Sequence, residues 1–218
     1  MRLGKKFTII GIGLMAAAIL FTVMVATIDV RPIGPNGSSV GLAGLNSAFA
    51  DAFGINKVLY VISEVCGYPA IIVALAFVAL GAYELVKRKN IFKVDYCILS
   101  MGVLFVVVMI LYILFDKMPI NYRPILESDG TLESSFPSSH TLLAVCILIP
   151  AIFSVGRIIK DKKIAFIITS VLAFLAVVVV ICRLFSGVHW LTDMIGGVFY
   201  SLALVCVYIG ANLLYENK

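Results

Sequence analysis

Toward its carboxyl-terminal end the chain carries a histidine and an aspartate at a spacing that suits nucleophilic chemistry. His189 and Asp193 are four residues apart, so on a helix they lie on one face. A carboxylate bonded to one imidazole nitrogen fixes the tautomer and leaves the other nitrogen free to attack. Arg183 precedes this pair and adds a guanidinium, a group that binds phosphate oxygens through two parallel hydrogen bonds.

A second polar group, Pro137-Ser138-Ser139-His140, stands just before an apolar run. Ser138 is a good candidate for a helix N-cap. The backbone N–H groups of residues 138–140 are then expected to point outward at the positive end of the helix, which is a natural anion site. His140 is a group that can protonate a leaving oxygen.

Lys117 and Arg123 add two more cations of the kind that hold phosphate. The set now contains a nucleophile, an orienting carboxylate, a general acid and a phosphate clamp, which suffice for phosphoryl transfer through a phosphohistidine. Asp193 is the one well-placed carboxylate in the set, whereas two-metal phosphatases need several ligands that bridge their ions. We therefore expect neither a catalytic metal nor a cofactor.

The composition indicates what must position these residues. Of 218 residues, 62% are hydrophobic and 13% charged, which excludes a soluble globular domain, a disordered chain and a secreted disulfide scaffold. A membrane-spanning helix needs about 20 apolar residues, and spanning segments must satisfy their own backbone hydrogen bonds. We predict an all-α polytopic bundle of six transmembrane helices, forming one domain over residues 1–218. The predicted spans are 7–27, 58–83, 96–115, 139–159, 164–181 and 190–214.

The first run could instead be a signal peptide, because basic residues precede it. At some 21 residues it exceeds the usual apolar region of about 7–15 residues, so we expect a retained helix.

The basic residues fall unevenly on the loops between these runs. Twelve of the seventeen lie on the side that carries the termini: Arg2, Lys5, Lys6, Lys87, Arg88, Lys89, Lys93, Arg157, Lys160, Lys162, Lys163 and Lys218. The positive-inside rule places that side in the cytoplasm, and it accounts for the net charge of +5 without a nucleic-acid partner. Loops 28–57, 116–138 and 182–189 then face outward from the cell (cytoplasmic) membrane. Helix parity puts all the residues considered above in one layer at this outer face.

Three sequence motifs resemble the signature of the type 2 phosphatidic acid phosphatase superfamily, the integral-membrane lipid phosphate phosphatases. That signature is Lys-x6-Arg-Pro, Pro-Ser-Gly-His and Ser-Arg-x5-His-x3-Asp. The third part matches from Arg183 to Asp193, with Cys182 in place of serine, and Ser139 replaces the glycine of the second. The first part, from Lys117 to Pro124, is one residue short. The resemblance covers about residues 96–214, the motif-bearing core.

The resemblance implies a role for each residue and a metal-independent reaction. His189 would be the nucleophile, Asp193 its partner and His140 the general acid. The implied phosphate-binding residues are Lys117, Arg123, Ser138, Ser139 and Arg183.

The expected function is hydrolysis of a phosphomonoester or diphosphate of a membrane lipid at the outer face. Phosphatidate, phosphatidylglycerol phosphate and undecaprenyl diphosphate all present the same phosphate to the same clamp, so the residues leave the substrate open. The alternatives are a transporter for an anion or lipid and a non-catalytic, lipid-binding relative. The sequence does not indicate an oligomeric state.

Three features outside the motifs stay open. Residues Leu42–Phe53 have the spacing of a short amphipathic helix on the membrane surface, or form a loop packed on the bundle. Glu64, within a predicted span, shapes the site or binds a lipid headgroup, or else bonds a neighbouring helix. Pro150 is expected to kink its helix, and such a kink could also open a lateral gap for lipid.

Overall fold

The computed structural model describes residues 3–127 and 129–217. Within them the α-helices are α1 (Leu3–Thr27), α2 (Ala43–Phe53), α3 (Lys57–Arg88), α4 (Tyr96–Lys117), α5 (Ser139–Ile158), α6 (Lys162–Phe185) and α7 (Leu191–Tyr215), with 3-10 turns at Pro35–Gly37 and Ile91–Lys93. All except α2 are long and apolar enough to cross a membrane. The predicted all-α fold and its six spans are confirmed, and the chain is a multi-pass membrane protein. Arg2 and Lys218, two of the basic residues used to assign orientation, lie outside the described residues.

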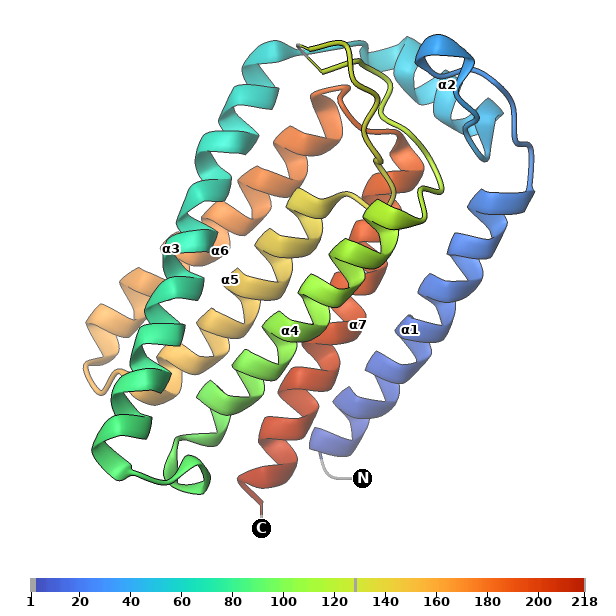
Figure 1. Cartoon of the computed structure of the whole chain (residues 1–218). Helices are drawn as coiled ribbons and strands as arrows, with labels where there is room; N and C mark the ends of the chain where they lie inside the picture. The colour runs from blue at the N-terminus through green and yellow to red at the C-terminus, as the bar shows by residue number, and fades with distance from the viewer. Residues whose placement is uncertain (1–2, 128, 218) are drawn as a thin grey trace.

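Helices α5 and α7 form the centre of the bundle, with the other spans around them (Figure 1). About half of the residues in their apolar windows are buried, against 28% or less in the other spans. Glycines bring α1 against α7, because a Cβ atom on Gly11 would lie 2.9 Å from the Ala203 carbonyl oxygen. The first apolar run is thus a packed member of the bundle.

Both chain ends lie at one end of the bundle, and α2 and the long loops lie at the other (Figure 1). We call the latter the distal end. It contains the end of α4, the end of α6 and the beginnings of α5 and α7, which are the places from which the motif residues come. The prediction that helix parity gathers these residues in one layer is confirmed.

The segment between α4 and α5 folds back on itself at the distal end. Tyr122 and Ser134 form an antiparallel bridge, and the Arg123 N–H donates to the Glu133 carbonyl at 3.0 Å. This pairing fixes Arg123 opposite an acidic residue.

Residues 43–53 form the expected short helix, and it also packs on the bundle. In α2, Asn46 is fully buried, and the rings of Phe49 and Phe53 lie 6.2 and 4.9 Å from that of Phe185. Pro150 stays inside α5, which is continuous from Ser139 to Ile158, so a lateral gap there stays a prediction.

Candidate functional site

The beginning of α7 holds the histidine–aspartate pair. Gly187 makes the preceding turn with φ of +74°, and a Cβ there would lie 2.1 Å from the Gly54 carbonyl oxygen, so the position requires glycine. Asp193 is fully buried, and its Oδ2 accepts the Trp190 N–H at 2.9 Å. His189 Nδ1 lies 3.6 Å from the same oxygen, close enough for a small rotation of the ring to complete a hydrogen bond.

A buried polar network behind Asp193 was missed by the sequence reasoning. Asn121 is fully buried and donates from Nδ2 to Asp193 Oδ1 at 2.9 Å, while its Oδ1 accepts the Gly41 N–H at 3.0 Å. Asn46 of α2 donates to Thr192 Oγ1 and accepts the Thr192 N–H. Asn121, itself held by Gly41, therefore fixes the carboxylate that faces His189, and Asn46 fixes the neighbouring Thr192. The signal available in the sequence was the position of Asn121 two residues before Arg123.

The beginning of α5 agrees only partly with the expected anion site. Ser138 is the N-cap residue as predicted, but its side chain makes no capping hydrogen bond. Its backbone N–H is also not free, because it donates to the Asp193 carbonyl at 3.0 Å. The expectation that three outward N–H groups are available is therefore wrong at Ser138. The amides of Ser139 and His140 begin the helix, where intrahelical acceptors are lacking.

His140 and Arg183 meet across the interface between α5 and α6, and Glu64 of α3 joins them. The distance from Arg183 Nη2 to His140 Nδ1 is 3.0 Å. Glu64 Oε1 lies 2.5 Å from Arg183 Nη1 and 3.1 Å from His140 Nε2. Arg183 is fully buried, so Glu64 supplies the counter-charge that a buried guanidinium requires. The expectation that Glu64 bonds neighbouring helices is therefore confirmed, and a role in shaping the site or binding a lipid headgroup stays a prediction.

Arg123 has a similar acidic environment. It is 9% exposed, its Nη1 lies 2.6 Å from Glu127 Oε1 and its Nη2 lies 3.1 Å from Glu133 Oε2. Lys117 is different. Its side chain is 78% exposed, and its amine pairs with Asp116 at 3.6 Å. The structure brings the other predicted residues together and leaves Lys117 at the rim, so its phosphate-binding role stays a prediction.

Buried polar atoms without a hydrogen-bond partner concentrate at this end of the molecule. Among the described residues there are seven such side-chain atoms. One of them is Ser38 Oγ, in the loop between α1 and α2. The others are Arg123 Nε, Ser135 Oγ, Ser138 Oγ, Arg183 Nε and both ring nitrogens of His189. Buried polar groups are normally paired, so these atoms indicate a place for a polar ligand that accepts hydrogen bonds.

Burial and charge set the state of the candidate nucleophile. Burial lowers the pKa of His189 well below its ordinary value, and the positive charges of Arg183 and Arg123 lower it further. The imidazole is therefore neutral at pH 7, the form in which a ring nitrogen is nucleophilic. Within residues 3–127 and 129–217 there is no group of three or more His, Cys, Asp or Glu side chains placed to hold a metal ion.

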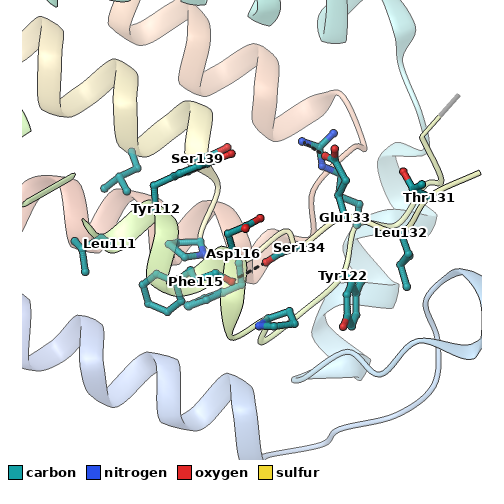
Figure 2. A pocket seen from close by; sticks show the side chains of 15 residues that line it. Leu111, Tyr112, Phe115, Asp116, Tyr122, Thr131, Leu132, Glu133, Ser134 and Ser139 are labelled. Carbon is teal, nitrogen blue, oxygen red and sulfur yellow. Dashed lines mark hydrogen bonds and ion pairs between the residues drawn. The ribbon is translucent and has the colours of Figure 1, made fainter. Parts of the chain in front are cut away.

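Three cavities reach the site from different sides. The first, of about 400 Å³, lies between α4, the folded-back loop and the beginning of α5, with Leu111 and Tyr112 on one side and Leu132 and Glu133 on the other (Figure 2). Arg123 and Ser139 also line it. The second, of about 340 Å³, extends from α2 to His189. The third is a groove of about 110 Å³ between α3 and α5, with Glu64 and His140 in its lining.

Comparison with known proteins identifies the family. The profile of the PAP2 superfamily matches residues 104–213. Phosphatidylglycerophosphatase B of Bacillus subtilis is 39% identical over 79 residues, which are 34% of this chain and 36% of that protein. The match therefore spans about a third of the length of that relative.

A solved structure has the same fold. The crystal structure of a transmembrane PAP2 type phosphatidylglycerolphosphate phosphatase from Bacillus subtilis matches with a TM-score of 0.60 at 21% identity. The match covers 95% of this chain and 97% of that one. With the family profile extending over half of its length, this chain belongs to the PAP2 superfamily.

Proposed function

We propose that this protein is an integral-membrane lipid phosphate phosphatase that acts through a phosphohistidine, without a metal ion. The main observation behind this proposal is that buried polar atoms without a hydrogen-bond partner, both ring nitrogens of His189 among them, gather at the distal end. Arg123 Nε and Arg183 Nε are donors, Ser138 Oγ donates or accepts, and a phosphate group offers the acceptor oxygens that such a set matches.

The first step transfers the phosphoryl group to His189. Nδ1 faces Asp193, so Nε2 is the attacking atom. As the Nε2–P bond forms, the bond from phosphorus to the lipid oxygen breaks, and His140 gives that oxygen a proton. The two arginines stabilise the charge on the non-bridging oxygens.

The second step releases phosphate. A water molecule attacks phosphorus, His140 takes a proton from it, and the P–N bond breaks to restore His189. Asp193 keeps the imidazole in the tautomer that both steps need, because its position is held by Trp190 and Asn121.

The substrate is a lipid that stays in the bilayer while its headgroup reaches the site. The cavity of about 400 Å³ supports this, because apolar side chains of α4 lead to Arg123 and Ser139. The partial similarity to phosphatidylglycerophosphatase B makes phosphatidylglycerol phosphate a candidate substrate, beside phosphatidate and undecaprenyl diphosphate.

The reaction takes place at the outer face of the cytoplasmic membrane. This assignment rests on the basic loops at the end that carries the termini, which the positive-inside rule assigns to the cytoplasm. The distal end, with the site, then faces outward.

The test is phosphate release by detergent-purified protein, with EDTA present, from all three candidate lipids. We expect release by the wild type that persists in EDTA and is lost in His189→Ala. The control is Asn212→Ala, which removes a buried polar side chain of the same helix, α7, far from the site. Absence of release from every lipid would favour transport or a non-catalytic role, and near-normal release by His189→Ala would exclude the phosphohistidine.

A further inference from the structure

Glu64 lies where the leaving group of the proposed reaction must depart. It is the eighth residue of α3, and its carboxylate contacts both His140 and Arg183 through Oε1. Its side chain is 28% exposed, so it is within reach of a bound molecule as well as of its two partners.

The contacts of His140 define the side on which the leaving oxygen lies. Arg183 only donates hydrogen bonds, so His140 Nδ1, at 3.0 Å, is an acceptor toward it. In the substrate-free site the His140 proton is therefore on Nε2, whose neighbour is Glu64 Oε1 at 3.1 Å. To act as an acid, His140 takes up a second proton at Nδ1 when Arg183 turns to the phosphate, so that it is a neutral imidazole after it gives the Nε2 proton away. A leaving oxygen that takes this proton comes to lie beside the Glu64 carboxylate.

The groove between α3 and α5 continues from this point. It is lined by Glu64, Gly67, Tyr68, Ala70, Ile71, His140, Leu143, Ala144 and Ile147. This lining is mostly apolar and contains no lysine or arginine. It suits the organic part of a leaving group and offers no cation to a second phosphate.

The cations near the site are already matched by carboxylates. Arg183 pairs with Glu64, and Arg123 pairs with both Glu127 and Glu133. Three acidic side chains thus face two guanidinium groups. One phosphate can still use the unpartnered Nε atoms, but a second phosphate beside Glu64 meets a like charge at short range, where little water screens it.

We propose that Glu64 is a specificity-determining residue that selects lipid phosphomonoesters over lipid diphosphates. This rests on the proposed phosphatase function and narrows its substrate class. When a monoester reacts, the departing group is an alcohol, which is uncharged once His140 has protonated it. When a diphosphate reacts, the departing group is a lipid monophosphate, which stays anionic after it takes that proton and is repelled by the Glu64 carboxylate.

The experiment compares farnesyl phosphate with farnesyl diphosphate, which share a chain and differ in the group that leaves. Initial rates of phosphate release give kcat/KM for each with wild type, Glu64→Gln and Glu84→Gln. Glu84 lies at the other end of α3, where it pairs with Arg88, so its variant is a matched control. We expect the wild type to prefer the monoester at least tenfold. Glu64→Gln should lower that preference at least tenfold, and Glu84→Gln should leave it within twofold.

The outcomes separate this proposal from the one on which it rests. Absence of release from both compounds by the wild type defeats the phosphatase function itself. Release with no preference in the wild type overturns the role of Glu64 alone. An equal loss on both compounds in Glu64→Gln also overturns it, because Glu64 then serves only to position Arg183.

A measurement on the wild type covers the case in which Glu64→Gln does not fold. Inorganic phosphate and pyrophosphate are compared as inhibitors of farnesyl phosphate hydrolysis. We expect phosphate to inhibit at a concentration at least tenfold lower than pyrophosphate. Inhibition by pyrophosphate at an equal or lower concentration contradicts the proposal.

Discussion

The surroundings of the two histidines differ in almost every respect, although both lie in one layer at the distal end. His189 is 4% exposed, both of its ring nitrogens lack a hydrogen-bond partner, and a buried carboxylate lies 3.6 Å from Nδ1. His140 is half-buried at the head of a groove, with a guanidinium on one nitrogen and a carboxylate on the other.

This difference supports the two roles that we propose for the two histidines. A neutral, desolvated imidazole with one nitrogen directed toward an aspartate has its other nitrogen available for attack. An imidazole between a donor and an acceptor is set up to hold and pass a proton. In the proposed mechanism, environment rather than residue type assigns nucleophile and acid, as in enzymes that contain paired titratable groups.

The largest expected effect comes from comparing two substrates whose leaving groups differ in their need for a proton. 4-Nitrophenolate departs without a proton, so 4-nitrophenyl phosphate does not require the general acid. We expect His140→Ala to lose about 100-fold or more in the rate of the first step on a lipid monophosphate and less than about tenfold on the nitrophenyl ester. His189→Ala should lose at least about 1000-fold on both, because no nucleophile remains. Single-turnover rates at which the alcohol or nitrophenolate departs provide the comparison, because the second step, which also uses His140, is the same for both compounds.

The reverse pattern would exchange the roles. If the aryl ester restored hydrolysis in His189→Ala and not in His140→Ala, His140 would be the nucleophile. Thermal unfolding of both variants in the same detergent checks that the difference is chemical.

A second prediction concerns the hydrogen-bond network that holds Asp193 in place beside His189. Asn121→Ala removes the donor to Asp193 Oδ1 and leaves the Gly41 N–H without its acceptor. A small displacement of a catalytic group can cost up to about 100-fold, so we expect kcat to fall about 10- to 100-fold while KM changes less than about threefold. Steady-state kinetics on a lipid monophosphate measures both constants.

The matched control for Asn121 is Asn212→Ala. Asn212 is also buried and donates to Ser100 Oγ and the Tyr208 carbonyl, but at the end of the bundle opposite the site. Each variant should lose about 1–3 kcal/mol of stability, because a buried polar partner is removed. A similar fall in kcat for both variants would mean that Asn121 acts through stability alone.

The fold could be predicted from hydropathy because a bilayer permits few backbone structures. Both ends of each predicted span lie within five residues of the corresponding ends of the observed helix. The pairing of His189 with Asp193 could also be predicted from the sequence, because it depends on a four-residue spacing. Asn121 and Asn46 could not be found this way, because their contacts join segments distant in sequence. The pairing of Glu64 with Arg183 depends on how α3 packs against α6, which apolar periodicity does not specify.

The smallest expected effect concerns Lys117, which the family resemblance assigns to phosphate binding. Its motif is one residue short, and its amine is solvated at the end of α4 beside Asp116, whereas Arg123 is buried in the cluster. Interactions of an exposed charge are weak because water screens them, typically below about 1 kcal/mol. We therefore expect Lys117→Ala to lower kcat/KM less than about fivefold, and Arg123→Ala to lower it at least about 30-fold, because a buried guanidinium that binds phosphate contributes more. Equal losses in the two variants, measured on one lipid monophosphate, would mean that Lys117 reaches the phosphate when substrate binds.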